Sequence, residues 1–373
     1  MIYLDNAATT FPKPRKVVEE VKRCIERYCG NPGRGAHPLA MAAAEKIYAC
    51  RELLCDLVGA PAPERVIFTQ NTTYALNFAI KGSFCDGDHV LYSELEHNAV
   101  RRPILALCAA HRITADTFPV VGLTEAELLA ELERRITPKT RGIVCTHASN
   151  VCSITLPLAA IGRLCQRKGL LFLVDAAQSA GRLPLHMREM HVDALALPGH
   201  KGLYGIQGCG ALVLGERLLP KPLLEGGSGV DSIPAQMPEL PPERYEAGTL
   251  ATPAIVGLAE GIRSLHNGQM QAVAKHEAEL FCALRERLSS LPDVVTYQPQ
   301  AVGSVLLFNK KQVPAAELGR RLARDGICVR AGLHCAPTAH QALGTPQDGA
   351  VRIGLGRYNT KAHLDALWRA LRK

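Results

Sequence analysis

Short apolar runs alternate with helical patterns over the first two thirds of the chain. Five runs have the length of a strand and are mostly apolar, namely residues 66–69, 89–92, 142–146, 170–174 and 194–197. Strands that are buried on both faces of a parallel sheet have this composition. Helical patterns begin after three of them, near Thr73, Asn98 and Ala159. The alternation predicts an α/β fold with a mainly parallel sheet flanked by helices.

The pattern changes after Thr252. Pro253 can open a helix, and a helical pattern runs from it to about Leu291 with one break at residues 267–268. Strands are then predicted at residues 294–297, 304–308 and 327–330, and helices at residues 315–324 and 361–371, the last capped by Asn359 or Thr360. We therefore expect a large domain, residues 15–252, and a smaller α+β domain formed by residues 1–14 and 253–373.

Composition narrows the choice of function. The 373 residues are 47% hydrophobic, and the net charge of +8 is scattered, so no nucleic-acid partner is expected. No apolar stretch reaches about 18 residues, and the chain does not open like a signal peptide, so we expect a cytoplasmic protein without a membrane helix. None of the 13 cysteines forms a CxxC pair, which predicts no metal site and mostly buried thiols in a reducing compartment.

Polar residues follow the predicted strands, where ligands bind in a parallel sheet. Asp175 follows the apolar run 170–174, and Lys201 lies in Leu-Pro-Gly-His-Lys-Gly after the run 194–197. Taken alone, Asp175 is as well explained as a helix N-cap, and Lys201 as a surface lysine in a Gly-rich loop. Together they fit a pyridoxal 5'-phosphate (PLP) site, which needs a lysine for the aldehyde and often an acid for the pyridine nitrogen.

Further candidates follow the other strands. Thr72 and Thr73 open a helix, where free N–H groups and hydroxyls can bind a phosphate or simply cap the helix. His97 follows the run 89–92 and can stack on an aromatic ring or lie at the surface. Asn150 follows the run 142–146 and can bond the cofactor's phenolic oxygen or occupy a turn.

The C-terminal part adds a cysteine and an arginine. Cys335 lies in a Gly- and Pro-flanked loop beside His334 and after Arg330, two groups that can favour the thiolate. Most of the cysteines are expected to be structural, and Cys335 is the exception. Arg352 can bind a carboxylate with two hydrogen bonds, or form a salt bridge between domains.

These motifs resemble those of a known enzyme family. The motifs are Asp175-Ala-Ala-Gln-Ser179, Gly199-His-Lys201, Glu246-Ala-Gly-Thr249 and Arg330-x-Gly-x-His-Cys335, together with Tyr3-Leu-Asp-Asn-Ala-Ala-Thr-Thr10, Gly30-Asn-Pro-Gly-Arg-Gly-Ala-His37, Glu96-His-Asn98 and Arg352 followed by Tyr358-Asn-Thr360. In this order they are similar to the class V, fold-type I PLP enzymes, and within them to the cysteine desulfurase and selenocysteine lyase group. The resemblance runs nearly end to end and implies the PLP-dependent transferase fold of type I.

The resemblance also implies a role for each residue. Lys201 would carry PLP and shuttle the Cα proton, and Cys335 would attack the sulfur of L-cysteine or L-selenocysteine. The cofactor contacts would be Asp175 at the pyridine nitrogen, Gln178 and Asn150 at the phenolic oxygen, His97 over the ring, Thr72, Thr73 and His200 at the phosphate, and Thr249 at the phosphate of the other subunit of a homodimer. Arg352, with Asn150 and Arg34 nearby, would bind the substrate. A sulfur-acceptor protein is a possible further partner.

Three residues depart from the family pattern, one of them Pro337 just after Cys335, which can stiffen that loop. Pro198 stands where Ser or Thr usually precedes Gly-His-Lys, which removes a hydroxyl and an N–H from the phosphate site. Ala251 stands where many relatives have Asn. Three readings therefore stay open. A cysteine desulfurase is preferred, because a transaminase does not need Cys335. A selenocysteine lyase or another PLP lyase or aminotransferase is second. A catalytically silent scaffold in sulfur delivery is third, and keeping Lys201, Asp175 and Cys335 together argues against it.

Overall fold

A seven-stranded sheet forms the centre of the protein. The computed structural model describes residues 1–33, 35–230, 233–297 and 300–373. The strands are β2 (Val66–Thr69), β3 (His89–Ser93), β4 (Thr114–Phe118), β5 (Thr140–Thr146), β6 (Leu171–Asp175), β7 (Ala194–Pro198) and β8 (Gly210–Leu214). Their order is β2-β8-β7-β6-β5-β3-β4, and β8 alone runs antiparallel to both neighbours. The predicted mainly parallel sheet is confirmed, whereas β4 and β8 were not predicted.

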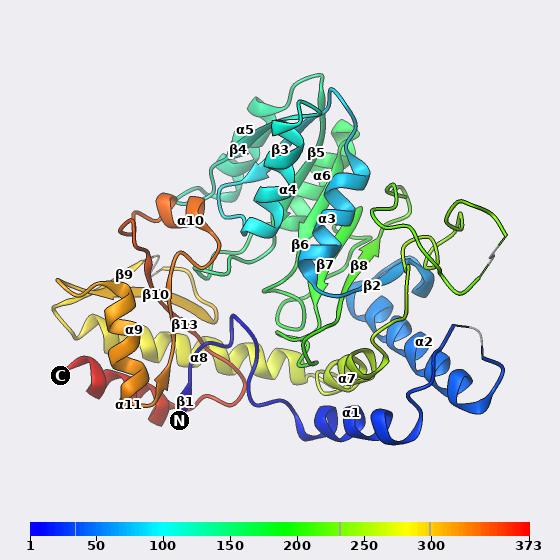
Figure 1. Ribbon diagram of the computed structural model, residues 1–373. Coiled ribbons are helices and arrows are strands. Elements are labelled where there is room, and N and C mark those ends of the chain that lie inside the picture. Colours follow the sequence, from blue (N-terminus) through cyan, green and yellow to red (C-terminus); the bar gives the residue numbers. More distant parts are fainter. Residues whose placement is uncertain (34, 231–232, 298–299) are drawn as a thin grey trace.

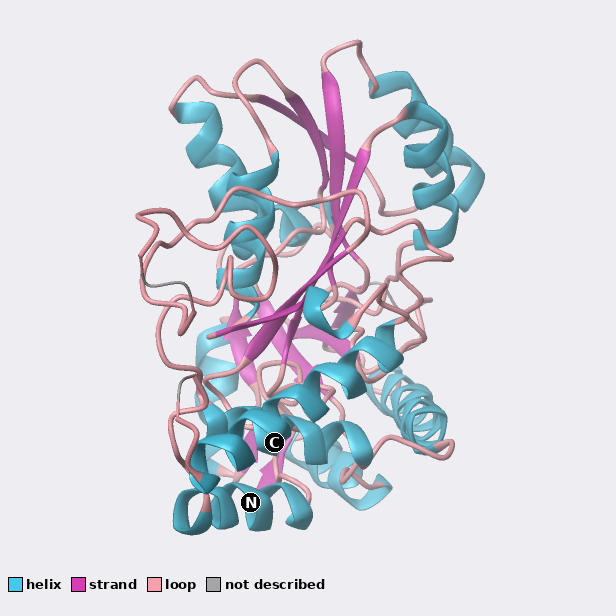
Figure 2. Ribbon diagram, turned by 90° about the vertical axis from the view of Figure 1, so that its right-hand side faces the viewer, coloured by secondary structure: helices cyan, strands magenta, loops and turns pink. Residues whose placement is uncertain are grey.

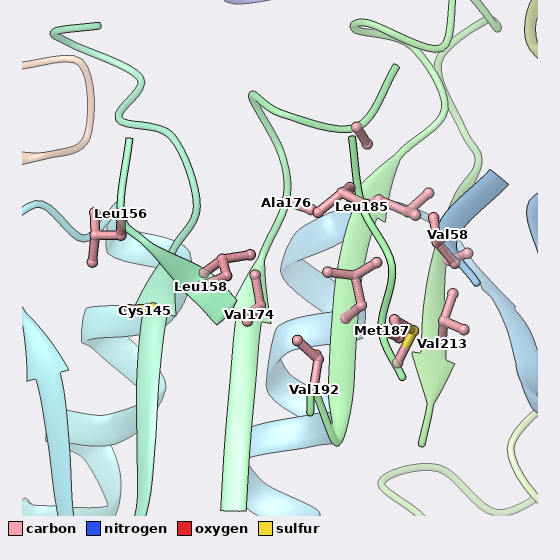
Figure 3. Close-up of a cluster of buried hydrophobic side chains, with 14 of the residues drawn as sticks. Val58, Cys145, Leu156, Leu158, Val174, Ala176, Leu185, Met187, Val192 and Val213 are labelled. Atoms are coloured by element: carbon pink, nitrogen blue, oxygen red, sulfur yellow. The ribbon is translucent and has the colours of Figure 1, made fainter. Parts of the chain in front are cut away.

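Helices cover both faces of this sheet, as Figure 2 shows. Those of this part are α1 (Arg15–Arg27), α2 (Pro38–Val58), α3 (Thr72–Ser83), α4 (Asn98–Ala109), α5 (Glu125–Arg135), α6 (Leu158–Lys168) and α7 (Thr252–Arg263). Successive side chains of a strand point to opposite faces. In β6, Leu171 and Leu173 accordingly pack with α3 and α4, whereas Phe172 and Val174 pack with α2, α5, α6 and α7. Figure 3 shows part of this second cluster, with Cys145 and Val174 beside Leu158. Burial on both faces explains why the strand sequences are almost continuously apolar.

The C-terminal third forms a second, smaller sheet. Its strands are β9 (Val294–Tyr297), β10 (Val305–Lys310), β12 (Arg330–Gly332) and β13 (Ala350–Gly354), in the antiparallel order β12-β13-β10-β9. Helices α8 (Gln269–Ser289), α9 (Ala315–Arg324) and α11 (Lys361–Leu371) cover it, and α10 (Pro337–Ala342) follows β12. The helical pattern after Pro253 is confirmed as α7 and α8, and Thr360 is the cap of α11. The domain limits drawn from the sequence stay a prediction.

The N-terminal strand is bound to the C-terminal part of the chain. Strand β1 (Ile2–Tyr3) pairs in parallel with β11 (Ile327–Cys328), and both termini lie in this region (Figure 1). The predicted strand at residues 327–330 is therefore two short strands that join different sheets. This pairing places residues 5–13 between β13 and the carboxyl edge of the large sheet.

One close approach in the core offers a test of the packing. A methyl group added at Gly162 of α6 would lie 1.9 Å from the carbonyl oxygen of Met190. We expect Gly162→Ala to lower the free energy of unfolding by about 2 kcal/mol or more, although alanine favours helices, because the backbone on the other side cannot yield. Urea denaturation measures this. The control is Arg163→Ala, its exposed neighbour, which should change stability by less than about 0.5 kcal/mol. If the two variants are equally stable, Gly162 does not lie in close contact with the Met190 carbonyl.

Candidate active site

A pocket lies at the carboxyl ends of four adjacent strands. Lys201 follows β7, Asp175 ends β6, Asn150 follows β5 and His97 follows β3. The pocket has a volume of about 110 Å³, and its lining is Asn71, Thr72, Thr73, His97, Ala99, Thr146, Ala148, Asn150, Asp175, Ala177, Gln178, His200 and Lys201. The structure thus brings together every residue predicted to contact the cofactor except Thr249.

The two charged groups at the base of the pocket do not pair with each other. Burial lowers the pKa of the Lys201 amine to about 8, against a partial opposing effect of Asp175. Burial also raises the pKa of Asp175, which is 3% exposed and whose Oδ1 accepts the N–H of Ala177 at 2.8 Å. A buried amine and a buried carboxylate are each costly unless a partner is supplied. Both are therefore available to a ligand that carries complementary groups.

The opposite wall is suited to an anion. The Asn71 side chain accepts the N–H of Tyr74 at 3.1 Å, so α3 begins here and Thr72 and Thr73 form its first turn. The N–H groups of a first helical turn have no partner within the helix and attract negative charge. The nearby His200 imidazole is neutral because burial lowers its pKa to about 4. Its buried Nδ1 has no hydrogen-bond partner among the described residues, so it is free for a ligand.

His97 is held in one orientation by the helix that follows it. It caps α4, and its Nδ1 accepts the N–H of Ala99 at 3.0 Å. Burial, assisted by the charges of Lys201 and Arg330, lowers its pKa to about 4. The ring is therefore neutral with its proton on Nε2, which suits stacking on a flat ligand.

The loop that carries Lys201 is braced by N-terminal residues that the sequence reasoning did not single out. The carbonyl oxygen of His200 accepts the N–H of Thr10 at 3.2 Å, the hydroxyl of Thr9 at 3.1 Å and the ammonium of Lys13 at 2.7 Å. Burial lowers the pKa of Lys13 to about 8. The motif Tyr3–Thr10 had been noted for its resemblance alone, and no local pattern indicates that it contacts residue 200.

Arg352 lies beside the pocket but is not among its lining residues. On β13 and only 2% exposed, it donates from Nη2 to Asp5 at 2.7 Å and from Nη1 to the carbonyl of Asn150 at 3.1 Å. Asp5 and Arg352 both belong to the predicted smaller domain, so this ion pair is not the salt bridge between domains that the sequence leaves open. The buried Nε of Arg352 has no partner among the residues described, so a donor remains for a carboxylate.

Cys335 lies in an ordered turn at the rim. Its carbonyl oxygen accepts the N–H of Asn98 at 2.6 Å, and the carbonyl of His334 accepts the Asn150 side chain at 2.8 Å. His334 and Cys335 both have positive φ, 52° and 57°, and the thiol-bearing residue is exposed. Burial lowers the pKa of His334 to about 3. Its neutral ring therefore does not supply the positive charge expected from the sequence beside the thiol.

One predicted site residue lies apart from the pocket, and for another the structure gives no position. Thr249 is exposed and lines a separate depression of about 800 Å³ together with Asn31, Gly33 and Tyr48. Arg34 lies outside the described residues. Over the ranges that the structure describes, no cluster of three or more His, Cys, Asp or Glu side chains is arranged to hold a metal, and no helix is both long and apolar enough to cross a membrane.

The chain resembles known proteins over its whole length. The family model "Aminotransferase class-V" matches residues 2–367. A probable cysteine desulfurase of Methanothermobacter thermautotrophicus is 33% identical over 99% of this chain and 94% of its own. A cysteine desulfurase of Escherichia coli is 30% identical over 100% of this chain and 93% of its own. The apo structure of the cysteine desulfurase from Thermococcus onnurineus superposes with a TM-score of 0.91 at 28% identity, covering 99% of this chain and 93% of the other.

Glu96, directly behind the pocket, makes stability depend on pH. Its Oε1 accepts the N–H of Thr146 at 2.7 Å and the hydroxyl of Ser93, and burial raises its pKa to about 8. Unfolding frees the carboxyl to ionise above its ordinary value of 4.5, so the wild type loses stability as pH rises from about 4.5 to 8. Glutamine keeps the accepting oxygen and cannot ionise. Glu96→Gln should therefore gain stability relative to wild type between pH 5.5 and pH 8, as measured by urea denaturation.

The matched control is the exposed Glu125→Gln, which removes the same charge from the surface. A stability difference between Glu96→Gln and wild type that is the same at both pH values would show that Glu96 is ionised in the folded protein.

Proposed function

The chain belongs to the aminotransferase class-V family, and on this basis we propose that it is a PLP-dependent cysteine desulfurase that converts L-cysteine to L-alanine and receives the sulfur on Cys335. One observation carries the proposal: the pocket with the buried amine and carboxylate lies next to the turn that bears an exposed thiol. Lys201 and Asp175 share one pocket without neutralising each other, and the Cys335 turn is held at its rim.

The residues present fit the cofactor. Lys201 has the amine for the aldehyde, and Asp175 has the carboxylate that would keep the pyridine nitrogen protonated. The first turn of α3 and the unpartnered Nδ1 of His200 would hold the phosphate. Pro198 lacks the hydroxyl that relatives place there, and the N–H groups at Thr72 and Thr73 supply donors instead.

The two amides can each serve the phenolic oxygen. The Gln178 amide donates one N–H to the carbonyl of Ala7 at 2.9 Å, and the Asn150 amide donates one to His334. Each NH₂ group has a second hydrogen. These hydrogens would orient the ring, with the neutral His97 imidazole stacked over it.

Three residues would act on the substrate. When bound, PLP draws electrons from Cα of the amino acid and makes its Cβ–S bond labile. Lys201, with a pKa of about 8, has an appreciable unprotonated fraction near neutral pH and would take the Cα proton. The free Nε–H of Arg352 would bind the carboxylate. The Cys335 thiolate would then attack the substrate sulfur.

The sulfur step balances without an outside oxidant. An S–S bond forms between Cys335 and the substrate sulfur while the Cβ–S bond breaks. The electron pair of that bond stays with the carbon, which takes up a proton and becomes the methyl group of alanine. The exposed persulfide on Cys335 would pass to a thiol acceptor, and we propose that this takes place in the cytoplasm, where the 13 free cysteines stay reduced.

The chemistry can be tested by alanine release from L-cysteine in the presence of a thiol reductant. Cys335→Ala should lower the rate at least about 100-fold while the protein keeps its visible absorbance, because the cofactor stays and the sulfur acceptor is lost. Lys201→Ala should lose both the alanine release and the visible absorbance. Cys85→Ala is the matched control. Cys85 is also exposed, but it precedes β3 and so lies at the amino ends of the strands, whereas the pocket lies at their carboxyl ends.

Two outcomes would reject the proposal. If Cys335→Ala is as active as wild type on selenocysteine and neither form uses cysteine, the protein is a lyase for another substrate. If purified wild type stays colourless with added PLP, the protein is not a PLP enzyme.

The exposed position of Thr249 leads to a second proposal, a homodimer in which Thr249 serves the partner's phosphate. Lys201→Ala and Thr249→Asp should each be nearly inactive, the second because aspartate repels a phosphate. After mixing and subunit exchange, the hybrid contains one site with both wild-type residues. Activity should then rise to at most about a quarter of wild type, the value for random exchange. If the subunits exchange and the mixture stays inactive, Thr249 does not act in the partner's site: it acts in the site of its own subunit or in neither site.

A further inference from the structure

A buried pair of histidines supports the Cys335 turn from behind. His334 Nδ1 lies 3.0 Å from His340 Nε2, and His340 Nδ1 lies 2.9 Å from the hydroxyl of Thr345. The ring planes differ by 14° and the centroids are 5.2 Å apart. The planes are nearly parallel, but an Nδ1···Nε2 distance of 3.0 Å with centroids 5.2 Å apart fits rings that lie side by side and share a hydrogen bond, and not rings stacked face to face.

The direction of these hydrogen bonds follows from a backbone carbonyl. His334 Nε2 faces the carbonyl oxygen of Arg330 at 3.3 Å, and a carbonyl can only accept, so this nitrogen carries the proton. His334 Nδ1 is then a lone pair and must accept from Nε2–H of His340. His340 Nδ1 in turn accepts from the hydroxyl of Thr345. Both rings are neutral with the proton on Nε2, in agreement with their lowered pKa values of about 3 and 4.

The chain of hydrogen bonds ends where the backbone is strained. His334 and Cys335 occupy the left-handed region in succession, which residues other than glycine adopt at a cost. The His334 carbonyl is held by Asn150 and the Cys335 carbonyl by Asn98, whereas the His334 side chain is held by His340. His340, only 1% exposed in α10, thus contacts the turn through the His334 side chain and not through its backbone carbonyls.

We propose that His340 is a positioning residue for the thiol: through the hydrogen bond to His334 it keeps the turn in the conformation in which Cys335 lies next to Asn98 and the pocket residue Asn150. The proposal rests on the function proposed above. His340 can have two separate roles: its bulk contributes to the packing of α10, and its Nε2–H is the donor that faces His334 Nδ1. A substitution that keeps the bulk and removes the donor distinguishes them.

The test compares His340→Leu with His340→Gln. Leucine fills the space and leaves His334 Nδ1 without a donor, whereas the amide of glutamine places an N–H near the position of Nε2. We expect His340→Leu to lower kcat for L-cysteine by about tenfold or more, with KM and the visible absorbance of the bound cofactor unchanged. His340→Gln should recover kcat to within about threefold of wild type.

His89→Leu is the matched control. His89 is also a buried histidine bonded to a threonine, with Nδ1 at 2.8 Å from the Thr140 hydroxyl, and it lies at the start of β3, away from the pocket. It should lower the melting temperature and leave kcat unchanged. If both His340 variants lose the same activity, or if His340→Leu keeps wild-type kcat, His340 is structural only.

A second measurement does not depend on desulfurase activity. In ¹⁵N-histidine NMR spectra of the wild-type protein at pH 7.5, both rings should be neutral with the proton on Nε2, the signals being assigned by their loss in His334 and His340 variants. A ring with its proton on Nδ1, or an imidazolium, would overturn the proposal. If the NMR result is as expected and L-cysteine is not used, the proposed function fails and the hydrogen-bond chain stands.

Discussion

The site depends on the burial of an amine and a carboxylate at the ends of neighbouring strands. Asp175 ends β6 and Lys201 follows β7, so the sheet itself sets their separation. Loss of water disfavours the charged form of each, which is why the pKa of Lys201 falls and that of Asp175 rises. A ligand that offers an aldehyde to one and a basic nitrogen to the other relieves both penalties. Binding of such a ligand would therefore stabilise the folded protein at this point.

The N-terminal segment joins this pocket to the smaller sheet. Asp5 pairs with Arg352 on β13, while Thr10 and Lys13 hold the carbonyl of His200 next to Lys201. The turn of Cys335 is fixed to the same assembly, because Asn150 contacts both Arg352 and His334. The substrate-binding arginine, the cofactor lysine and the sulfur acceptor of the proposed mechanism thus belong to one network of hydrogen bonds, although they come from different sheets.

Much of the fold could be predicted because it follows from local patterns. Continuous apolar runs revealed five central strands, and the residues after them reach one edge because parallel strands end there. Strand β4 was missed because it is an edge strand with mostly polar, exposed positions, such as Thr114 and Asp116. The brace from Lys13 to His200 and the contact between His334 and His340 were missed for another reason. The first joins residues far apart in sequence, and the second depends on the orientation of two side chains, which no periodicity encodes.

The pairing of β1 with β11 has a consequence for the order in which the protein forms during translation. The two strands are separated by more than 300 residues, so β1 leaves the ribosome long before β11 is made. Asp5 also lacks its partner until late, since Arg352 is synthesised after β11. The seven-stranded sheet and the pocket lining, residues 71–201, can form while the chain is still growing, whereas Arg352 and the Cys335 turn, which bond to Asn150 and Asn98, are added only near the end of synthesis. A nascent chain that stalls before β13 would expose a pocket without Arg352, and Asp5 would lack its ion-pair partner.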